Sequence, residues 1–312
     1  MSKKAEISIV ILLAEETPDF AQYVKMLCDL FQRRGMLFEL IIIANGVEGF
    51  LRTQLGFMPE GCGSIKVFSF PSRVSHAVCV RAAVKESSAE ILVMCGSYRQ
   101  IAVDAFAELL NALDDNVDLV CPWRRHRIDS LLKKVQSRIF TAIIVFLTGS
   151  KLHDLNGTPR VLRRQVLESI RLYGNMYRFL PILAQQKGYQ VREVVCAHAQ
   201  ERGKTGFYSF SEYLERLVDI GTLYFNTRFS RKPLRFFSTV GAVLMASGFL
   251  ISIWVFIQKI LHKVSIGDSL ELMTAVILMV AGVAAAGLGL LGEIIAFTHG
   301  RQIKEYTIEK II

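Results

Sequence analysis

The chain contains 312 residues, of which 52% are hydrophobic and 21% are charged. With only 7 prolines and 22 glycines, this composition excludes a collagen-like chain, and the hydrophobic excess excludes a disordered one. At about 150 residues per domain, the length predicts about two domains. The hydrophobic share is larger than most soluble domains carry, so we expect a membrane part.

No two of the six cysteines lie within 15 residues of each other, which excludes zinc-ribbon and thioredoxin-type spacings. A chain of this length needs no disulfides to fold, so we expect six reduced thiols that face the cytosol. The net charge of +9 fits nucleic acid, acidic lipid or phosphorylated ligands as partners. The positions of the charges decide among these three classes.

Residues 1–210 alternate between short apolar runs and helical patterns. The first run, Ile7–Ala14, follows Lys3 and Lys4 as in a signal peptide, but Glu15 and Glu16 come next and no small-residue cleavage site is present. It is therefore interpreted as a buried strand. The predicted strands are Ile7–Leu13, Phe38–Ile43, Ile65–Phe70, Ile91–Met94, Leu119–Cys121 and Val191–Cys196.

The first predicted helix has Thr17 as its N-cap, Pro18 at its first position and Gly35 at its end. A second helix is expected over Val103–Leu113. This order of elements predicts an α/β fold in which a mostly parallel sheet carries helices on both faces. Because ligands bind beyond the carboxyl ends of the strands in such sheets, the residues directly after each strand are the candidates for chemistry.

The C-terminal third contains two uncharged runs, Phe236–Ile257 with 22 residues and Leu272–Gly292 with 21. At 1.5 Å per residue, each covers about 30 Å, the thickness of a hydrocarbon core, so we expect two transmembrane helices. Two such runs make buried helices of a soluble protein the poorer interpretation. The second run carries small residues that would allow close packing on the partner helix or on another subunit: Gly282, Ala285, Ala286 and Gly289.

These patterns divide the chain into a domain at 1–210, an interfacial helix and basic linker at 211–235, a hairpin at 236–292 and a tail at 293–312. The interfacial helix is Leu217–Phe229, where apolar residues stand between charges. A longer helix is expected over Asp129–Gly149, and its apolar second half either lies on the membrane surface or packs in the core.

Lysine and arginine cluster at the outer ends of the two runs and are few, and offset by acids, between them. The positive-inside rule therefore places both termini and the large domain in the cytosol. The basic cluster before the first run suits anionic headgroups and explains part of the net charge. No basic stripe is interleaved with aromatic residues, so we expect no nucleic-acid partner. The outer residues are Arg216, Arg228, Arg231, Lys232, Arg235, Arg301, Lys304 and Lys310, and the inner ones are Lys259, Lys263, Asp268 and Glu271.

Eight segments, in order along nearly the whole chain, resemble the family-2 glycosyltransferases that load a sugar onto polyprenyl phosphate. Dolichol-phosphate mannose synthase and bactoprenol glucosyltransferases are of this type. The resemblance implies a GT-A-like fold for residues 1–210 and a place in the inner membrane of a bacterium. The segments are Ser8–Glu16, Glu39–Gly49, Ala89–Gln100, Asp118–Arg127, Asp154–Arg164, Gly203–Thr205, Pro233–Arg235 and Gly289–Tyr306.

On the donor side, the resemblance implies a nucleotide-sugar bound through Mg²⁺ or Mn²⁺, which carboxylates would hold. The place of the family's D-x-D motif reads Cys95-Gly96-Ser97, the Asp pair after the second strand reads Ala44-Asn45, and a further acid is replaced by Gln100. We therefore predict no metal ligand. The predicted donor-binding residues are Glu16, Gly46, Glu48, Ser97 and Arg202.

On the acceptor side, the resemblance places Arg124, Lys133 and Ser137 on the lipid phosphate, which needs charge-assisted donors. It places Asp154 as the general base of an inverting transfer. Without the resemblance, Arg124 would be a solvated residue after a strand and Asp154 a turn cap, and these interpretations stay open.

Two hypotheses follow. The chain is either an active glycosyltransferase that uses polyprenyl phosphate and altered donor contacts, or a pseudoenzyme that partners an active glycosyltransferase. A lipid-phosphate translocation component is a third, poorer interpretation, because two spans per chain form a path only in an oligomer. Self-association through the second run is an open alternative.

Overall fold

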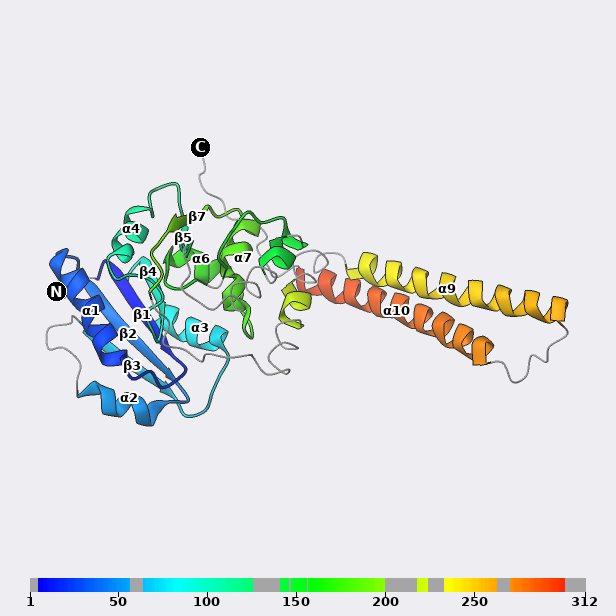
Figure 1. Cartoon of the computed structure of the whole chain (residues 1–312), viewed down its shortest axis with the longest axis horizontal. Helices are drawn as coiled ribbons and strands as arrows, with labels where there is room; N and C mark the ends of the chain where they lie inside the picture. The colour runs from blue at the N-terminus through cyan, green and yellow to red at the C-terminus, as the bar shows by residue number, and fades with distance from the viewer. Residues whose placement is uncertain are drawn as a thin grey trace. The chain divides into compact units, whose positions relative to one another are not determined.

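The computed structural model describes residues 5–56, 64–125, 141–145, 147–155, 157–199, 218–223, 233–262 and 270–300. The chain forms two compact units, residues 1–220 and 221–312. The first is an α/β unit and the second contains a pair of long helices, and both are drawn in Figure 1.

A seven-stranded sheet with the order β3-β2-β1-β4-β6-β5-β7 forms the centre of the first unit. Neighbouring strands run parallel except at β6, which is antiparallel to both β4 and β5. This confirms the predicted α/β class with a mostly parallel sheet. The strands are β1 (Ile7–Leu13), β2 (Phe38–Asn45), β3 (Ser64–Phe70), β4 (Ile91–Gly96), β5 (Leu119–Trp123), β6 (Arg160–Arg163) and β7 (Val191–Val195).

The inner strands β1 and β2 are buried at every position. Such continuous apolar runs are typical of strands with both faces covered. One face of the sheet packs on α1 (Phe20–Arg33), α2 (Glu48–Leu55) and α4 (Ala105–Asn111) in a single apolar core. The other face carries α3 (His76–Glu86), α6 (Arg164–Ser169), the short helix η1 (Met176–Phe179) and α7 (Leu180–Gln186) (Figure 1).

Helix α1 begins at Phe20, after the predicted start, and Asp19 takes the N-cap position. The Thr17 hydroxyl donates instead to the Glu15 carbonyl oxygen at 3.3 Å, so the predicted cap is wrong. Gly35 follows the helix with φ 66°, as expected for the left-handed residue that ends many helices.

Four of the five cysteines in the described ranges are unpaired. Cys79, Cys95, Cys121 and Cys196 are free and buried, whereas Cys28 on α1 is disulfide-bonded. The expectation of six reduced thiols is therefore wrong at Cys28.

The direction of winding reverses between β1 and β4. From β1 the chain moves outward through β2 to β3, and it then returns through α3 to place β4 on the other side of β1. Open α/β sheets bind ligands at such a point, beyond the carboxyl ends of the strands. Residues 14–16 and 97–100 follow β1 and β4 and lie at this edge.

The second unit contains α9 (Pro233–His262) and α10 (Leu270–Gly300), which pack against each other. Their segments Leu234–Gln258 and Leu270–Ile295 each have a mean hydropathy of 2.3 and are long and apolar enough to cross a membrane. This agrees with the two spans that the sequence predicts.

Glycines bring α9 and α10 into close contact. A Cβ atom at Gly282 would lie 2.7 Å from the carbonyl oxygen of Gly241, and one at Gly248 would lie 2.7 Å from that of Ala275. A Cβ atom at Gly289 would lie 2.9 Å from Cβ of Phe237. The small residues of the second run were expected to pack on the partner helix or on another subunit. The structure shows Gly282 and Gly289 packed on the partner helix, α9.

The two predicted amphipathic segments fall largely outside the described residues. Within Asp129–Gly149, residues 141–145 are helical, and within Leu217–Phe229, residues 218–223 are helical. The choice between membrane surface and core for Asp129–Gly149, and the interfacial position of Leu217–Phe229, stay predictions.

Candidate functional site

The carboxyl edge of the sheet brings together most of the predicted site residues. Glu16 follows β1, Gly46 and Glu48 follow β2, and Ser97 follows β4. Arg124 follows β5 at the same edge, and Asp154 contacts it. The predicted Lys133, Ser137 and Arg202 lie outside the described residues.

Arg124 and Asp154 form a buried bidentate ion pair. Arg124 Nε donates to Asp154 Oδ2 at 2.7 Å, and Nη2 donates to Oδ1 at 3.1 Å. The side chains are only 2% and 7% exposed. The predicted phosphate ligand and the predicted general base thus neutralise each other, and this geometry is the strong form of a carboxylate–guanidinium contact.

Gln100 extends this pair toward the end of β4. Its Oε1 accepts hydrogen bonds from Arg124 Nη1 at 3.1 Å and from the Thr158 amide at 3.0 Å, while its Nε2 donates to the Tyr98 hydroxyl at 3.2 Å. The amide that replaces a family acid therefore supplies a neutral acceptor to a guanidinium already paired with Asp154. A second carboxylate here would place two negative charges around one cation.

A second polar cluster lies beside the ion pair. The Glu193 carboxylate on β7 accepts the backbone N–H groups of His153 at 2.8 Å and Asp154 at 3.0 Å. His153 Nδ1 lies 2.8 Å from Glu193 Oε2, and its ring stacks on Trp123 with centroids 4.1 Å apart. One carboxylate thus holds both residues of the segment that carries the predicted base.

The loop after β3 fills part of the edge near β2. The Asn45 side chain both donates to and accepts from the backbone of Val74 at 2.8 Å. Arg73 covers Gly46, where a Cβ atom would lie 2.8 Å from Arg73 Cγ, and its Nη2 donates to the Ala14 carbonyl at 3.0 Å. The residue that replaces a family Asp therefore anchors a neighbouring loop.

The remaining donor-side candidates differ in their surroundings. Glu16 is exposed, while Ser97 is buried. Glu48, at the first turn of α2, pairs with Arg52 at 2.6 Å, and hydrogen bonds from Arg52 and Ser69 lower the pKa of its carboxyl group.

Cys95 stands at the first position of the D-x-D place and points into the core. Its side chain is buried, and burial raises the pKa of the thiol to about 12, although a hydrogen bond with Tyr23 acts in the opposite direction. A neutral, buried thiol is not a ligand for a hard cation such as Mg²⁺.

The described residues at this edge do not fit a divalent metal. Across the described ranges, no group of three or more His, Cys, Asp or Glu side chains is placed to hold an ion. At the D-x-D place itself, Cys95 and Ser97 are both buried and neither is a carboxylate.

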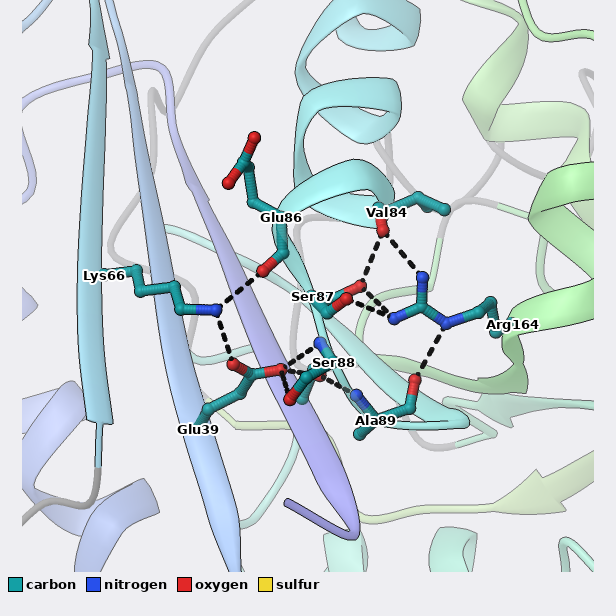
Figure 2. A network of polar contacts seen from close by, with 9 residues as sticks. Glu39, Lys66, Val84, Glu86, Ser87, Ser88, Ala89 and Arg164 are labelled. Atoms are coloured by element: carbon teal, nitrogen blue, oxygen red, sulfur yellow. Dashed lines mark hydrogen bonds and ion pairs between the residues drawn. The ribbon is translucent and has the colours of Figure 1, made fainter. Parts of the chain in front are cut away.

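The two arginines of the segment at Asp154–Arg164 bind backbone carbonyls. Arg160 is buried and its guanidinium donates to the carbonyls of Leu155, Tyr177 and Arg178. Arg164 donates to the carbonyls of Val84, Ser87 and Ala89, as Figure 2 shows. Arg160 thus joins Leu155 to η1, and Arg164 holds the end of α3 and the segment after it, which gives this part of the motif a structural reason.

The same network contains Glu39 near the start of β2, at the edge opposite the site (Figure 2). Its carboxylate accepts from the Ser8 hydroxyl at 2.6 Å and from Ser88, and Lys66 Nζ lies 3.0 Å away. Burial raises the pKa of Glu39, but these contacts outweigh burial and lower it to about 2.

Comparison with known proteins shows the protein family to which this fold and this carboxyl edge belong. The model of the glycosyl transferase family 2 matches residues 8–171, so the chain belongs to that family. The matched range covers β1 to β6 and includes Arg124 and Asp154.

Curated relatives match nearly the full chain. It is 24% identical over 311 residues to the undecaprenyl-phosphate 4-deoxy-4-formamido-L-arabinose transferase of Pseudomonas paraeruginosa, covering 98% of this chain and 90% of the relative. It is also 24% identical to the dodecaprenyl-phosphate galacturonate synthase of Rhizobium johnstonii, covering 95% and 89%. These relatives place the chain with the polyprenyl-phosphate type of the family.

Among solved structures, glucosyl-3-phosphoglycerate synthase from Mycobacterium tuberculosis, in complex with phosphoglyceric acid, matches with a TM-score of 0.52 at 13% identity. The match covers 72% of this chain and 80% of that one. At this identity the likeness shows the fold alone, and it confirms the GT-A-like architecture.

Sequence reasoning missed the residues that hold the site together. The sequence does not predict Trp123, His153 and Glu193 as site residues, and it shows Gln100 only as the replacement of a family acid. His153 directly precedes Asp154 and Trp123 directly precedes Arg124, so adjacency to predicted residues was the available signal. The sequence offers no comparable signal for Glu193, because its partners lie about 40 residues away.

Proposed function

We propose that this chain is a membrane-anchored glycosyltransferase that moves a sugar from a nucleotide-sugar to polyprenyl phosphate without a carboxylate-bound metal. The observation that carries the proposal is the nearly full-length match to relatives whose names contain undecaprenyl-phosphate and dodecaprenyl-phosphate. This match extends through both apolar helices. The product class would serve synthesis of cell-envelope glycans.

In the proposed reaction, a phosphate oxygen of the lipid forms a bond to the anomeric carbon as the bond from that carbon to the nucleoside diphosphate breaks. Glu16, Gly46, Glu48, Ser97 and Arg202 are the proposed donor-side residues. On the acceptor side, Lys133 and Ser137 would contact the lipid phosphate. Asp154 would act as base only after leaving Arg124, because the two are paired in this structure.

The proposed location is the inner membrane of a bacterium, with both termini and the α/β unit in the cytosol. The excess of lysine and arginine outside the two spans supports this orientation. The proposed partner there is the membrane lipid itself, whose phosphate would meet the carboxyl edge of the sheet.

A pseudoenzyme is the second candidate, and two observations favour it. Asn45 is engaged by the backbone of Val74, and Cys95 is turned into the core, so two places where the family carries donor-side acids serve the fold here. Such a protein would keep the anchor and act as partner or regulator of an active glycosyltransferase.

The first experiment is calorimetry of the detergent-purified full chain with UDP- and GDP-sugars, with Mg²⁺ or Mn²⁺ and with EDTA. A transfer assay to undecaprenyl phosphate follows under the same conditions. The proposal predicts binding and transfer that persist in EDTA. The matched variant carries Cys95→Asp and Ser97→Asp, which would restore acids at the D-x-D place.

The outcomes support or contradict the two candidates separately. Transfer that requires a metal in the parent chain contradicts the metal-free proposal. Absence of binding to every nucleotide-sugar by a folded sample that still binds polyprenyl phosphate supports the pseudoenzyme. Metal-dependent nucleotide binding that appears only in the double variant supports a pseudoenzyme derived from a metal-dependent ancestor.

A further inference from the structure

The imidazole of His153 is exposed and at the same time fixed. The side chain is 57% exposed, yet Nδ1 contacts Glu193 Oε2 at 2.8 Å and the ring lies on Trp123 with an interplanar angle of 16°. The His153 amide also donates to Glu193. An exposed ring held by a carboxylate, a stacking partner and its own backbone is a preorganised group.

These contacts decide which atom of the ring meets a ligand. With Nδ1 against Glu193, Nε2 is the ring nitrogen left for an outside partner, and a proton on Nε2 makes it a donor to an oxyanion. Glu193 itself is 10% exposed and accepts two backbone N–H groups, so its charge is directed inward.

The surroundings of His153 favour an anion. The exposed guanidinium of Arg125 lies 5.9 Å from the centre of the Trp123 ring, and Lys151 is exposed two residues before His153. Arg124, in contrast, is 2% exposed and bound to Asp154. An anion that arrives from solvent therefore meets His153 and Arg125 before it meets Arg124.

We propose that His153, held by Glu193 and Trp123, is a phosphate-contacting residue on the acceptor side of the site, with Arg125 as its cationic neighbour. This rests on the proposed function, since the phosphate would be that of the polyprenyl acceptor. Glu193 is a positioning residue, because it acts through the imidazole.

The first test does not need turnover. The full chain in detergent is treated with diethyl pyrocarbonate, and modification of each histidine is followed by mass spectrometry. The arms contain undecaprenyl phosphate, undecaprenol without phosphate, or inorganic phosphate. With lipid phosphate at ten times its Kd, mass action predicts about tenfold slower modification of His153. His76, an exposed histidine at the start of α3, is the internal control and should not change.

The arms separate the sources of the phosphate. Protection by undecaprenyl phosphate alone supports a lipid headgroup site, and protection by inorganic phosphate as well supports recognition of the phosphate group itself. Protection by undecaprenol, or no protection of His153 by either phosphate, overturns the proposal. These results hold whether or not the protein transfers sugar, so a failure of the proposed function remains distinguishable.

The second test uses His153→Gln, Glu193→Gln and, as control, His76→Gln. In the transfer assay, loss of a charge-assisted contact to phosphate should raise KM for the lipid about tenfold in His153→Gln with little change in kcat. Glu193→Gln should raise KM less and should speed modification of His153, because the ring is then less firmly held. If His153→Gln lowers kcat and leaves KM unchanged, His153 does not contact the acceptor phosphate.

Discussion

Arg124 and Asp154 carry opposite charges, lie 30 positions apart in the sequence and are both almost fully buried. A guanidinium that donates twice to one carboxylate and once to Gln100 is neutralised inside the protein. Removal of one partner leaves the other as an uncompensated charge at low dielectric, which is the costly case for a buried pair. The pair is therefore central to the stability of this edge, whatever role it has in transfer.

We predict that Asp154→Asn destabilises the α/β unit by about 3–5 kcal/mol, because it leaves the Arg124 charge buried and unpaired. Thermal unfolding in detergent measures the effect. The matched control is the double variant Arg124→Met with Asp154→Leu, which removes both charges and should recover most of the stability. Additive losses in the double variant would show that the two side chains do not act as a pair.

Glu39 makes a pH-dependent contribution to stability. Its pKa is about 2 in the folded protein and 4.5 as the ordinary value, so the folded state favours the carboxylate. The stabilisation is complete above about pH 4.5 and is lost as the pH falls toward 2, with an upper bound of about 3 kcal/mol. In a plot of the unfolding midpoint against pH, we expect Glu39→Gln to show a smaller decrease at acid pH than the parent protein. Parallel curves for the two proteins would contradict this.

At the scale of the elements, α9 and α10 are joined by backbone contact. Gly282 and Gly241 let the two helices approach so closely that no Cβ atom fits between them. At one end of the pair, Glu293 Oε2 lies 3.3 Å from the amide nitrogen of Leu234, in the first turn of α9, and accepts its hydrogen. First-turn amides have no partner within their own helix, so Glu293 fixes the register of the pair.

We predict opposite signs for two glycine substitutions in α10. Gly287→Ala places its Cβ atom in open space and should stabilise the helix by up to about 1 kcal/mol through propensity. Gly282→Ala meets the Gly241 carbonyl oxygen at 2.7 Å and should destabilise the hairpin by about 1–3 kcal/mol through overpacking. Thermal unfolding in detergent compares the stability of the two variants. Equal effects of both changes would contradict the close contact.

At the scale of the whole molecule, sequence patterns predicted the parallel strands and both long helices, because continuous apolar runs have few alternative structures. Strand β6 escaped prediction, since it has four residues and begins and ends with arginine. The edge residues were predicted from motif order. The contacts of these residues were not predicted. The contact between Arg124 and Asp154 depends on the turn that leads into β6, and the contact between His153 and Glu193 depends on the placement of β7.

Membrane orientation is a property of the whole chain and can be measured directly. Because lysine and arginine are in excess outside the two spans, we expect a C-terminal green fluorescent protein fusion to fluoresce in bacterial cells. Alkaline phosphatase, which needs the oxidising periplasm for its disulfides, should be active when inserted within residues 263–269. An active phosphatase at the C-terminus would reverse the proposed orientation.

The reversed direction of β6 divides the carboxyl edge of the sheet into two halves. The residues on one half of the edge follow β1, β2 and β4. Those on the other half lie on or after β5, on β7 and in the turn that leads into β6. Each half has its own anchors, Asn45 with Val74 in one and Glu193 with His153 in the other. Gln100, which follows β4, accepts hydrogen bonds from Arg124 and from the Thr158 amide in the second half, so a substitution at the end of β4 would act on both halves of the edge at once.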